Sequence, residues 1–296
     1  MPKPALSQRP PHRGASAVDA GDRRSPVYQL IRVLLLAFVA FNVVIFLWLL
    51  MSSFKDSRAI FGSPWTLPTT WHIENYVSAW LSSEIATDAR NSVLVVTVSA
   101  AAIVALSAPA AYALSRFGVR GSGWLTTYMA LGMGIPVQAA IIPIFVGLAK
   151  VGLLDSLTGL ILLYVATSLP FTVFFLTAFF RTLPPELEEA AALDGASPLR
   201  TFLRVMLPLA RPGIVTVLLL NVIALWNETF LALVLIGDTA NYTLSLGLLG
   251  MYGTMQYTSN WGGLFAGVCI VVLPMLVLYV VLSRRIIEGM TVGASR

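Results

Sequence analysis

The chain has 296 residues, of which 57% are hydrophobic and only 11% are charged. A soluble domain averages about 25% charged residues, so this composition excludes an ordinary soluble protein and predicts one that lies in lipid. The formal net charge of +5 comes without a clustered basic surface, which excludes a nucleic-acid partner.

Six apolar runs follow one another along the chain, and each is long enough to cross a bilayer as a helix of about 20 residues. The runs are continuous rather than alternating, so we expect helices and not the strands of a barrel. The predicted fold class is all-α, a polytopic membrane protein with six transmembrane helices. The predicted spans are residues 27–51, 92–114, 124–149, 157–180, 212–236 and 262–283.

The lysines and arginines set the expected orientation. With the N-terminus in the cytoplasm, 15 of the 19 basic residues fall on the inner side, as the positive-inside rule requires. We therefore expect a multi-pass protein of the cytoplasmic membrane with both termini in the cytoplasm. The expected organisation is a disordered tail at 1–26, a first helix at 27–53, an outer loop at 54–86, a five-helix membrane domain at 87–284 and a cytoplasmic tail at 285–296.

Two outer loops and one span have unusual compositions. The loop at 54–86 is rich in tryptophan, which suits either the membrane interface or an external partner. The loop at 237–261 is rich in glycine and tyrosine, and either folds back toward the mouth of a pore or contacts a docked protein. In the third span, Pro136 and Pro143 flank Gln138, and proline at membrane depth predicts a local kink.

The residue types needed for catalysis are missing or scattered. The histidines, His12 and His72, lie far apart, and no lysine follows a glycine as the ATP-binding Walker A motif requires. No carboxylate cluster sits at membrane depth to hold a coupling ion. The single cysteine, Cys269, is expected to be a small apolar filler. We therefore expect no enzyme, and no metal or cofactor bound by this chain.

A small set of polar and aromatic residues lies within the spans. An ionised side chain near the bilayer centre costs about 2.5–3.5 kcal/mol, so Glu228 needs a wet cavity or a hydrogen-bonding partner. Two interpretations stay open: the set holds helices together, or it lines a polar translocation path in which Trp226 stacks on a sugar. The path candidates are Asn42, Gln138, Asn221, Trp226, Asn227 and Glu228.

An acidic segment at 181–211 separates the fourth and fifth spans. The prolines at 184–185 suit a first helical turn, and the glutamates that follow are favoured there by the helix dipole. Gly195 allows the left-handed backbone that ends a helix, and 197–198 form an N-cap followed by a first-turn proline. Pro208 is expected to break the chain before the fifth span. The segment thus predicts a short helix–turn–helix, the alternative being an ordinary amphipathic surface loop.

The same segment carries a resemblance. Residues 189–191, 194–196 and 207–209 resemble the E-A-A…D-G-A…L-P-L signature, the EAA motif, of ABC importer permeases, and aspartate before the glycine is typical of sugar permeases. Asn91-Ser92, the closing Arg116 of the second span, and the tail at 288–294 agree with this. Over about residues 27–294 the chain is similar to the shorter, six-helix subunit of the maltose-type sugar permease family.

The resemblance implies a type I ABC importer fold and the translocation of a di- or oligosaccharide by alternating access. The implied partners are a second homologous permease, two ATPase subunits that bind ATP and Mg, an extracytoplasmic sugar-binding protein, the sugar itself and membrane lipid. A glycerol-phosphate cargo and an ion-coupled secondary transporter using Glu228 remain alternatives, although no basic residue lies at membrane depth to bind a phosphate. The residues implied to couple to the ATPase are Glu189, Ala190, Ala191, Asp194, Gly195, Ala196 and Pro208.

Overall fold

The computed structural model describes residues 26–82, 84–117 and 121–294. The predicted disordered tail therefore lies, except for Pro26, outside the described residues. Within them the secondary structure is helical without a β-strand, which confirms the all-α class. Internal contacts divide the chain into two units, 1–51 and 52–296.

The first unit is represented by α2 (Pro26–Ser52), which corresponds to the span expected at 27–51. Its polar residue Asn42 donates an Nδ2–H to the carbonyl of Phe38 in the same helix, at 2.8 Å. The second unit contains, in chain order, α3 (Ser57–Gly62), α4 (Glu74–Ser82), α5 (Ile85–Arg116), α6 (Ser122–Gly134), η1 (Val137–Ala140), α7 (Ile141–Lys150), α8 (Leu157–Thr182), α9 (Glu186–Leu193), α10 (Pro198–Thr201), η2 (Phe202–Met206), α11 (Leu207–Leu209), α12 (Arg211–Trp226), α13 (Phe230–Leu235), η3 (Thr239–Asn241), α14 (Leu244–Thr258) and α15 (Trp261–Ala294).

Four helices of the described residues are individually long and apolar enough to cross a membrane: α2, α5, α8 and the part of α15 up to Val281. The count rises to six only if two bent helix pairs are each taken as one span. The helix α15 continues to Ala294, so most of the tail expected at 285–296 prolongs the last helix.

Two predicted spans are interrupted, one at the place of the expected kink and the other where no break was expected. In the span expected at 124–149, the axis turns by 87° between Gly134 and Val137, because Pro136 offers no N–H to continue the helix. The expected kink is thus a full break. In the span expected at 212–236, α12 ends at Trp226 and α13 begins at Phe230.

The two outer loops of the prediction are largely helical. The loop at 54–86 contains α3 and α4, and the loop at 237–261 contains the 15-residue helix α14. Lys55 is buried and its ammonium donates to the carbonyl oxygens of Ser63, at 2.9 Å, and Pro64, at 3.3 Å. This lysine therefore holds the first loop in a fixed turn.

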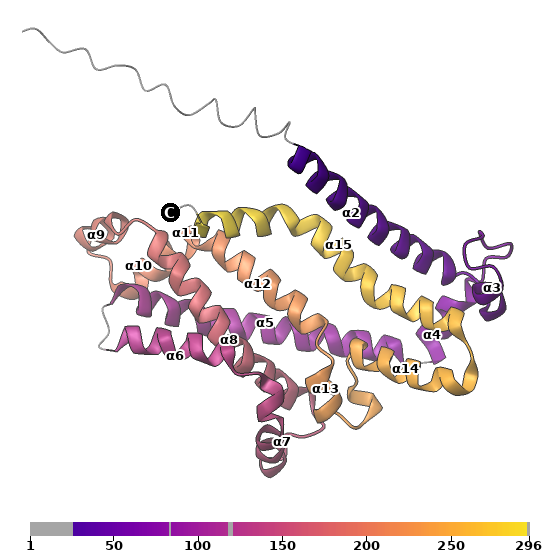
Figure 1. Ribbon diagram of the computed structural model, residues 1–296. Coiled ribbons are helices and arrows are strands. Elements are labelled where there is room, and N and C mark those ends of the chain that lie inside the picture. Colours follow the sequence, from indigo (N-terminus) through magenta and orange to yellow (C-terminus); the bar gives the residue numbers. More distant parts are fainter. Residues whose placement is uncertain (1–25, 83, 118–120, 295–296) are drawn as a thin grey trace, which may run out of the picture. The chain divides into compact units, whose positions relative to one another are not determined.

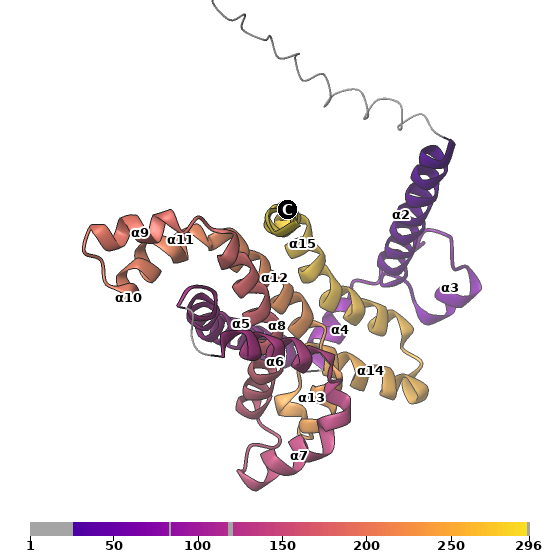
Figure 2. The ribbon, with the colours of Figure 1, turned by 60° about the vertical axis from the view of Figure 1, so that its left-hand side comes forward.

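The helices α5 and α8 pack lengthwise and form the centre of the second unit. Small residues on α5, such as Ala100, Ala108 and Ala111, are buried and let the helix backbones approach closely, as in membrane bundles. Figures 1 and 2 show α9–α11 at the C-terminal end of α5, and α4 and α14 at its N-terminal end. These two ends carry the features described below.

Candidate functional site

The helix α9 lies at the start of the segment 181–211. It follows Pro185 and carries Glu186, Glu188 and Glu189 in its first turn, where the positive end of the helix dipole favours carboxylates. Three alanines continue it to Leu193. Local sequence chemistry is therefore sufficient to explain where this helix begins.

The end of α9 is a complete Schellman turn. Gly195 has φ +74°, and its N–H donates to the carbonyl of Ala192 at 3.0 Å, while the N–H of Ala196 donates to Ala191 at 2.9 Å. No atom lies within 4 Å of where a Cβ would stand on Gly195. The glycine is therefore required by the left-handed backbone and not by space, which confirms the predicted turn.

The second half of the segment is packed onto the membrane helices. The hydroxyl of Ser197 accepts the N–H of Arg200 at 3.4 Å, which confirms the predicted N-cap. Phe202 and Met206 are buried, and the ring of Phe202 stacks on Tyr112 of α5 with centroids 5.0 Å apart. Phe202 and Met206 therefore rest on packed helices rather than on lipid.

The break before the fifth span lies two residues after Pro208. Pro208 itself belongs to α11, where its missing N–H falls in a first helical turn. The chain bends by 72° between Leu209 and Arg211. The chain therefore breaks before the fifth span, as predicted, but the prediction that Pro208 is the point of the break was wrong.

Arg116, at the end of α5, ties the segment to the bundle. Its Nε lies 2.9 Å from Glu188 Oε1 in an ion pair. One terminal nitrogen, Nη2, donates to the carbonyl oxygens of Phe180, at 2.9 Å, and Leu183, at 2.6 Å, at the end of α8. The sequence shows Arg116 as part of a motif but does not reveal this role, because its partners lie more than 60 residues away.

The outward face of the segment is exposed. The side chain of Leu193 is 90% exposed and that of Leu199 is 67% exposed, and Glu189 and Ala190 are exposed as well. Ala191 is buried and faces the opposite way. One side of α9 thus packs inward, and the other presents an apolar and acidic surface.

A second polar constellation lies at the break between α12 and α13. The carboxylate of Glu228 accepts the N–H of Leu231 at 2.7 Å, the N–H of Ala232 at 3.2 Å and the hydroxyl of Tyr164 at 2.7 Å. Glu228 therefore caps the start of α13, where the helix dipole also favours its charge. A hydrogen-bonding partner, one of the two alternatives that the sequence left open, is present.

Trp226 is packed rather than free to stack on a ligand. Its indole N–H donates to the carbonyl of Val271 in α15 at 3.1 Å, and its own carbonyl accepts the hydroxyl of Ser245 in α14 at 2.7 Å. Asn227 is exposed, and its amide donates to the carbonyl of Ile223 at 2.8 Å. Of the three residues at the break, Asn227 is the one that faces outward.

The remaining path candidates do not join this site. Asn221 is buried and donates to Thr172 Oγ1 in α8 at 3.0 Å and to the carbonyl of Val217 at 2.9 Å, so it holds α12 to α8. Gln138 lies exposed in η1, and Asn42 belongs to the first unit. The structure therefore groups only Trp226, Asn227 and Glu228.

A cavity of about 320 Å³ opens beside the break. Its hydroxyl-bearing residues are Thr229, Ser245 and Tyr252, and the others are aliphatic. An aromatic ring with several hydroxyls is a surface on which a neutral polar solute can rest. From the sequence, Tyr252 was only one residue of a tyrosine-rich loop. The helix α14, which places it at this cavity, was not predicted.

The far end of α13 is also held by a carboxylate. Asp155 Oδ1 accepts the N–H of Asp238 at 2.9 Å and that of Gly237 at 3.0 Å, and its own N–H donates to the carbonyl of Leu235. The backbone hydrogen bonds from Asp238 and Gly237 hold the pKa of Asp155 below its ordinary value. Both ends of this short helix are thus fixed by acidic side chains.

Comparisons with known proteins agree with this arrangement. A family model described as "Binding-protein-dependent transport system inner membrane component" matches residues 103–288. The "Diacetylchitobiose uptake system permease protein NgcG" of Streptomyces coelicolor is 40% identical over 95% of this chain and 93% of its own length. The "Trehalose transport system permease protein SugB" of Mycobacterium tuberculosis is 31% identical over 93% of this chain and 98% of its own.

A solved structure shares the fold. A chain of a bacterial ABC transporter "involved in the import of the acidic polysaccharide alginate" aligns with a TM-score of 0.75 at 23% identity, covering 90% of this chain and 98% of that one. This likeness shows the fold of an ABC importer permease. By the extent of the family match and the identity to its relatives, the chain belongs to the family of binding-protein-dependent transport system inner membrane components.

Proposed function

We propose that this chain is a permease subunit of an ATP-driven importer that moves a di- or oligosaccharide across the cytoplasmic membrane by alternating access. The observation that carries the proposal is the segment 181–211. It is a capped helix–turn–helix that buries one face on α5 and α8 and leaves Glu189 and Leu193 exposed. In this proposal the exposed Leu193 and Leu199, together with Glu189, form the surface that a partner protein contacts.

In this proposal two ATPase subunits bind ATP and Mg²⁺, and α9 sits in a groove of one of them. Residues 189–191, 194–196 and Pro208 form the coupling element. ATP-driven closure of the ATPase pair displaces the segment. The displacement passes to α5 because Glu188 of α9 forms an ion pair with Arg116 and Phe202 of η2 stacks on Tyr112. Such rigid-body switching needs a ligand that binds two states with different affinity.

A second homologous permease and an extracytoplasmic sugar-binding protein complete the assembly in this proposal. The relatives named above are described for diacetylchitobiose uptake and trehalose transport, which supports a sugar cargo. The cavity beside Thr229 and Tyr252 supports a neutral rather than a phosphorylated solute, because its lining carries hydroxyls and no basic side chain.

The ion-coupled alternative is disfavoured by the position of Glu228. A coupling carboxylate must be free to take up and release an ion or proton. The carboxylate of Glu228 already accepts three hydrogen bonds, two of them from the backbone of α13. Releasing it for ion binding would uncap that helix.

The test uses the complete importer in proteoliposomes, with diacetylchitobiose and trehalose as the first sugars offered. Glu189→Lys and Gly195→Asp are expected to abolish sugar uptake and the rise in ATP hydrolysis that sugar-loaded binding protein causes. Gly195→Asp strains a left-handed backbone, at a cost of about 1–2 kcal/mol, and places a charge on the docking turn.

The matched control is Gly152→Asp. Gly152 also has a positive φ, +69°, with no atom within 4 Å of an added Cβ, but it lies in the turn after α7. It should keep coupled uptake, because it bears the same backbone strain away from the segment. Wild-type coupling in both segment variants would contradict the proposal.

A further inference from the structure

A second cavity, here called the acidic pocket, lies at the opposite end of α5 from Arg116. A helix of 32 residues is about 48 Å long, which exceeds the thickness of a bilayer's hydrocarbon core, about 30 Å. If the segment 181–211 meets ATPases in the cytoplasm, the acidic pocket therefore opens on the outer face. It is lined by Glu84, Asp88, Thr239, Tyr242, Gly247, Gly250, Met251 and Thr254.

Asp88 is a buried carboxylate without a counter-charge. Asp88 is only 2% exposed, and its Oδ1 has no hydrogen-bond partner within the described part of the chain. The carboxylate packs directly over Gly247, where a methyl group would overlap it. Burying an ionised carboxylate without a partner is strongly unfavourable, so this group either keeps its proton or is balanced by a positive charge from elsewhere.

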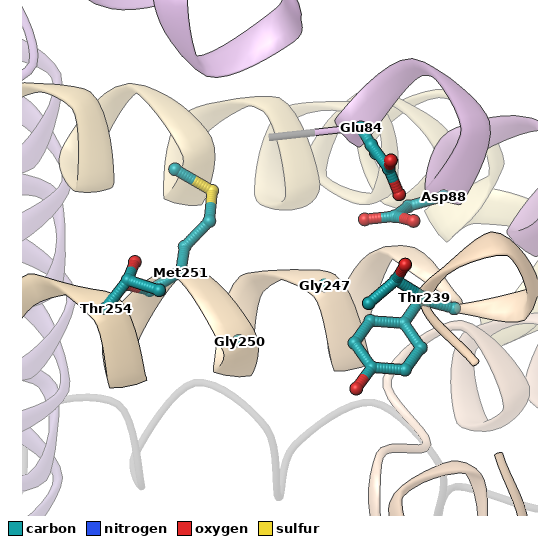
Figure 3. A pocket seen from close by; sticks show the side chains of 8 residues that line it. Glu84, Asp88, Thr239, Gly247, Gly250, Met251 and Thr254 are labelled. Carbon is teal, nitrogen blue, oxygen red and sulfur yellow. The ribbon is translucent and has the colours of Figure 1, made fainter. Parts of the chain in front are cut away.

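Glu84 adds a second negative charge above the first. It precedes α5 in a left-handed conformation, with φ 54°, and Figure 3 shows its carboxyl group reaching toward that of Asp88. No basic side chain lines the acidic pocket, and neither carboxylate forms an ion pair within the residues that the structure describes. Two facing carboxylates repel each other when both are ionised, so either one of them keeps its proton or a cation lies between them.

The size and lining of the acidic pocket select the kind of cation. Its volume is about 420 Å³, whereas a water molecule occupies about 30 Å³, so a single ion fills a small part of it. The described residues include no cluster of three or more His, Cys, Asp or Glu that could hold a metal. The ring of Tyr242 and the hydroxyls of Thr239 and Thr254 instead suit an alkyl ammonium or a guanidinium group.

We propose that the acidic pocket receives a lysine or arginine side chain of the extracytoplasmic protein that docks on this end of the permease. The inference rests on the proposed function, which supplies such a protein. Glu84 meets the cation at the rim, and Asp88 provides the buried charge beneath it. Complementary charge at a docking surface steers the encounter and fixes its register.

The experiment measures ATP hydrolysis by the complete importer while the concentration of its sugar-loaded binding protein is varied. Asp88→Asn and Glu84→Gln are each expected to raise the half-maximal concentration of binding protein by about tenfold or more. Raising the salt concentration should weaken the wild-type response more than that of either variant. Glu74→Gln is the matched control, because it removes an exposed carboxylate of α4 that lies outside the acidic pocket.

A charge swap identifies the occupant. Glu84→Lys should weaken the response further, and replacing each exposed lysine or arginine of the binding protein by glutamate should reveal one change that restores it. Failure of every swap, or an unchanged half-maximal concentration in both neutral variants, would overturn the proposal. A change confined to the KM for sugar would assign the pocket to the solute, and loss of activity in EDTA restored by Ca²⁺ would assign it to a metal. Both outcomes also overturn the proposal.

Two readouts separate this proposal from the proposed function. Assembly of each variant is checked by size-exclusion chromatography, so that a misfolded Asp88→Asn protein leaves Glu84→Gln as the deciding variant. The function itself fails only if the wild-type importer shows no sugar-dependent ATP hydrolysis, whereas the acidic pocket is tested by the shift between wild type and variants.

Discussion

The segment 181–211 and the break after α12 handle their charged residues in opposite ways. In the segment, Glu188 forms an ion pair with Arg116, and its neighbour Glu189 stays exposed. At the break, Glu228 is satisfied by three hydrogen bonds from within the chain. The difference teaches that the carboxylate at the break completes the backbone of its own chain, while the segment leaves one carboxylate, Glu189, exposed.

The largest expected effect comes from breaking the polar network at the helix break. Glu228→Ala leaves two N–H groups of α13 and the Tyr164 hydroxyl without an acceptor, so thermal unfolding in detergent should show a loss of about 2–4 kcal/mol. Asn227→Ala, which alters an exposed neighbour, is the control and should change stability little. Equal stability of the two variants would mean that Glu228 does not cap α13.

Arg116→Lys should have the next largest effect, on coupling more than on folding. A lysine keeps the charge but cannot engage a carboxylate and two carbonyls at once. The free energy that holds the segment to α5 and α8 is therefore expected to fall by about 1.5–3 kcal/mol. Sugar uptake should fall while the ATPase subunits still hydrolyse ATP. Arg181→Lys, an exposed arginine at the end of α8, should behave as wild type. Loss of uptake in both variants would point to a general need for arginine at this membrane face.

Asn221→Leu separates the two interpretations that the sequence left open for the path candidates. If Asn221 only joins α12 to α8, stability should fall by about 0.6–1.7 kcal/mol, with the KM for sugar unchanged. Thermal unfolding and initial uptake rates measure the two quantities. A raised KM at normal stability would instead place Asn221 in contact with the solute.

Asp155→Asn should give the smallest effect, and one that depends on pH. The folded-state pKa of Asp155 is lowered, so its carboxylate stabilises the fold fully above the ordinary aspartate pKa of about 3.9. That contribution is lost as the pH falls through the lowered value. Melting curves of wild type and variant should therefore differ near neutral pH and converge in acid. A constant difference across that range would exclude the ionised carboxylate as the cause.

The segment 181–211 could be predicted because its causes are local. The prolines at 184–185, Gly195 and Ser197 act on residues within a few positions, and the structure places the turn and the N-cap where the sequence indicates them. The exact end before the fifth span was missed, because Pro208 is accommodated in a first helical turn.

The break after α12 could not be predicted, because its causes are distant. Nothing in Trp226-Asn227-Glu228 is a strong helix breaker by itself. The break is stabilised by Tyr164, Ser245 and Val271, which belong to three other helices. Hydropathy likewise measures how apolar 124–149 is but not whether one axis runs through it, and so it cannot distinguish a straight span from one bent by 87°.

The continuity of α5 has a mechanical consequence. One helix carries Arg116 at one end and Asp88 at the other, and it has buried residues along its whole length, from Ile85 to Leu114. A helix packed in this way is a direct physical link between the segment 181–211 and the acidic pocket. A shift at one of these two sites can then reach the other through a single element of the chain.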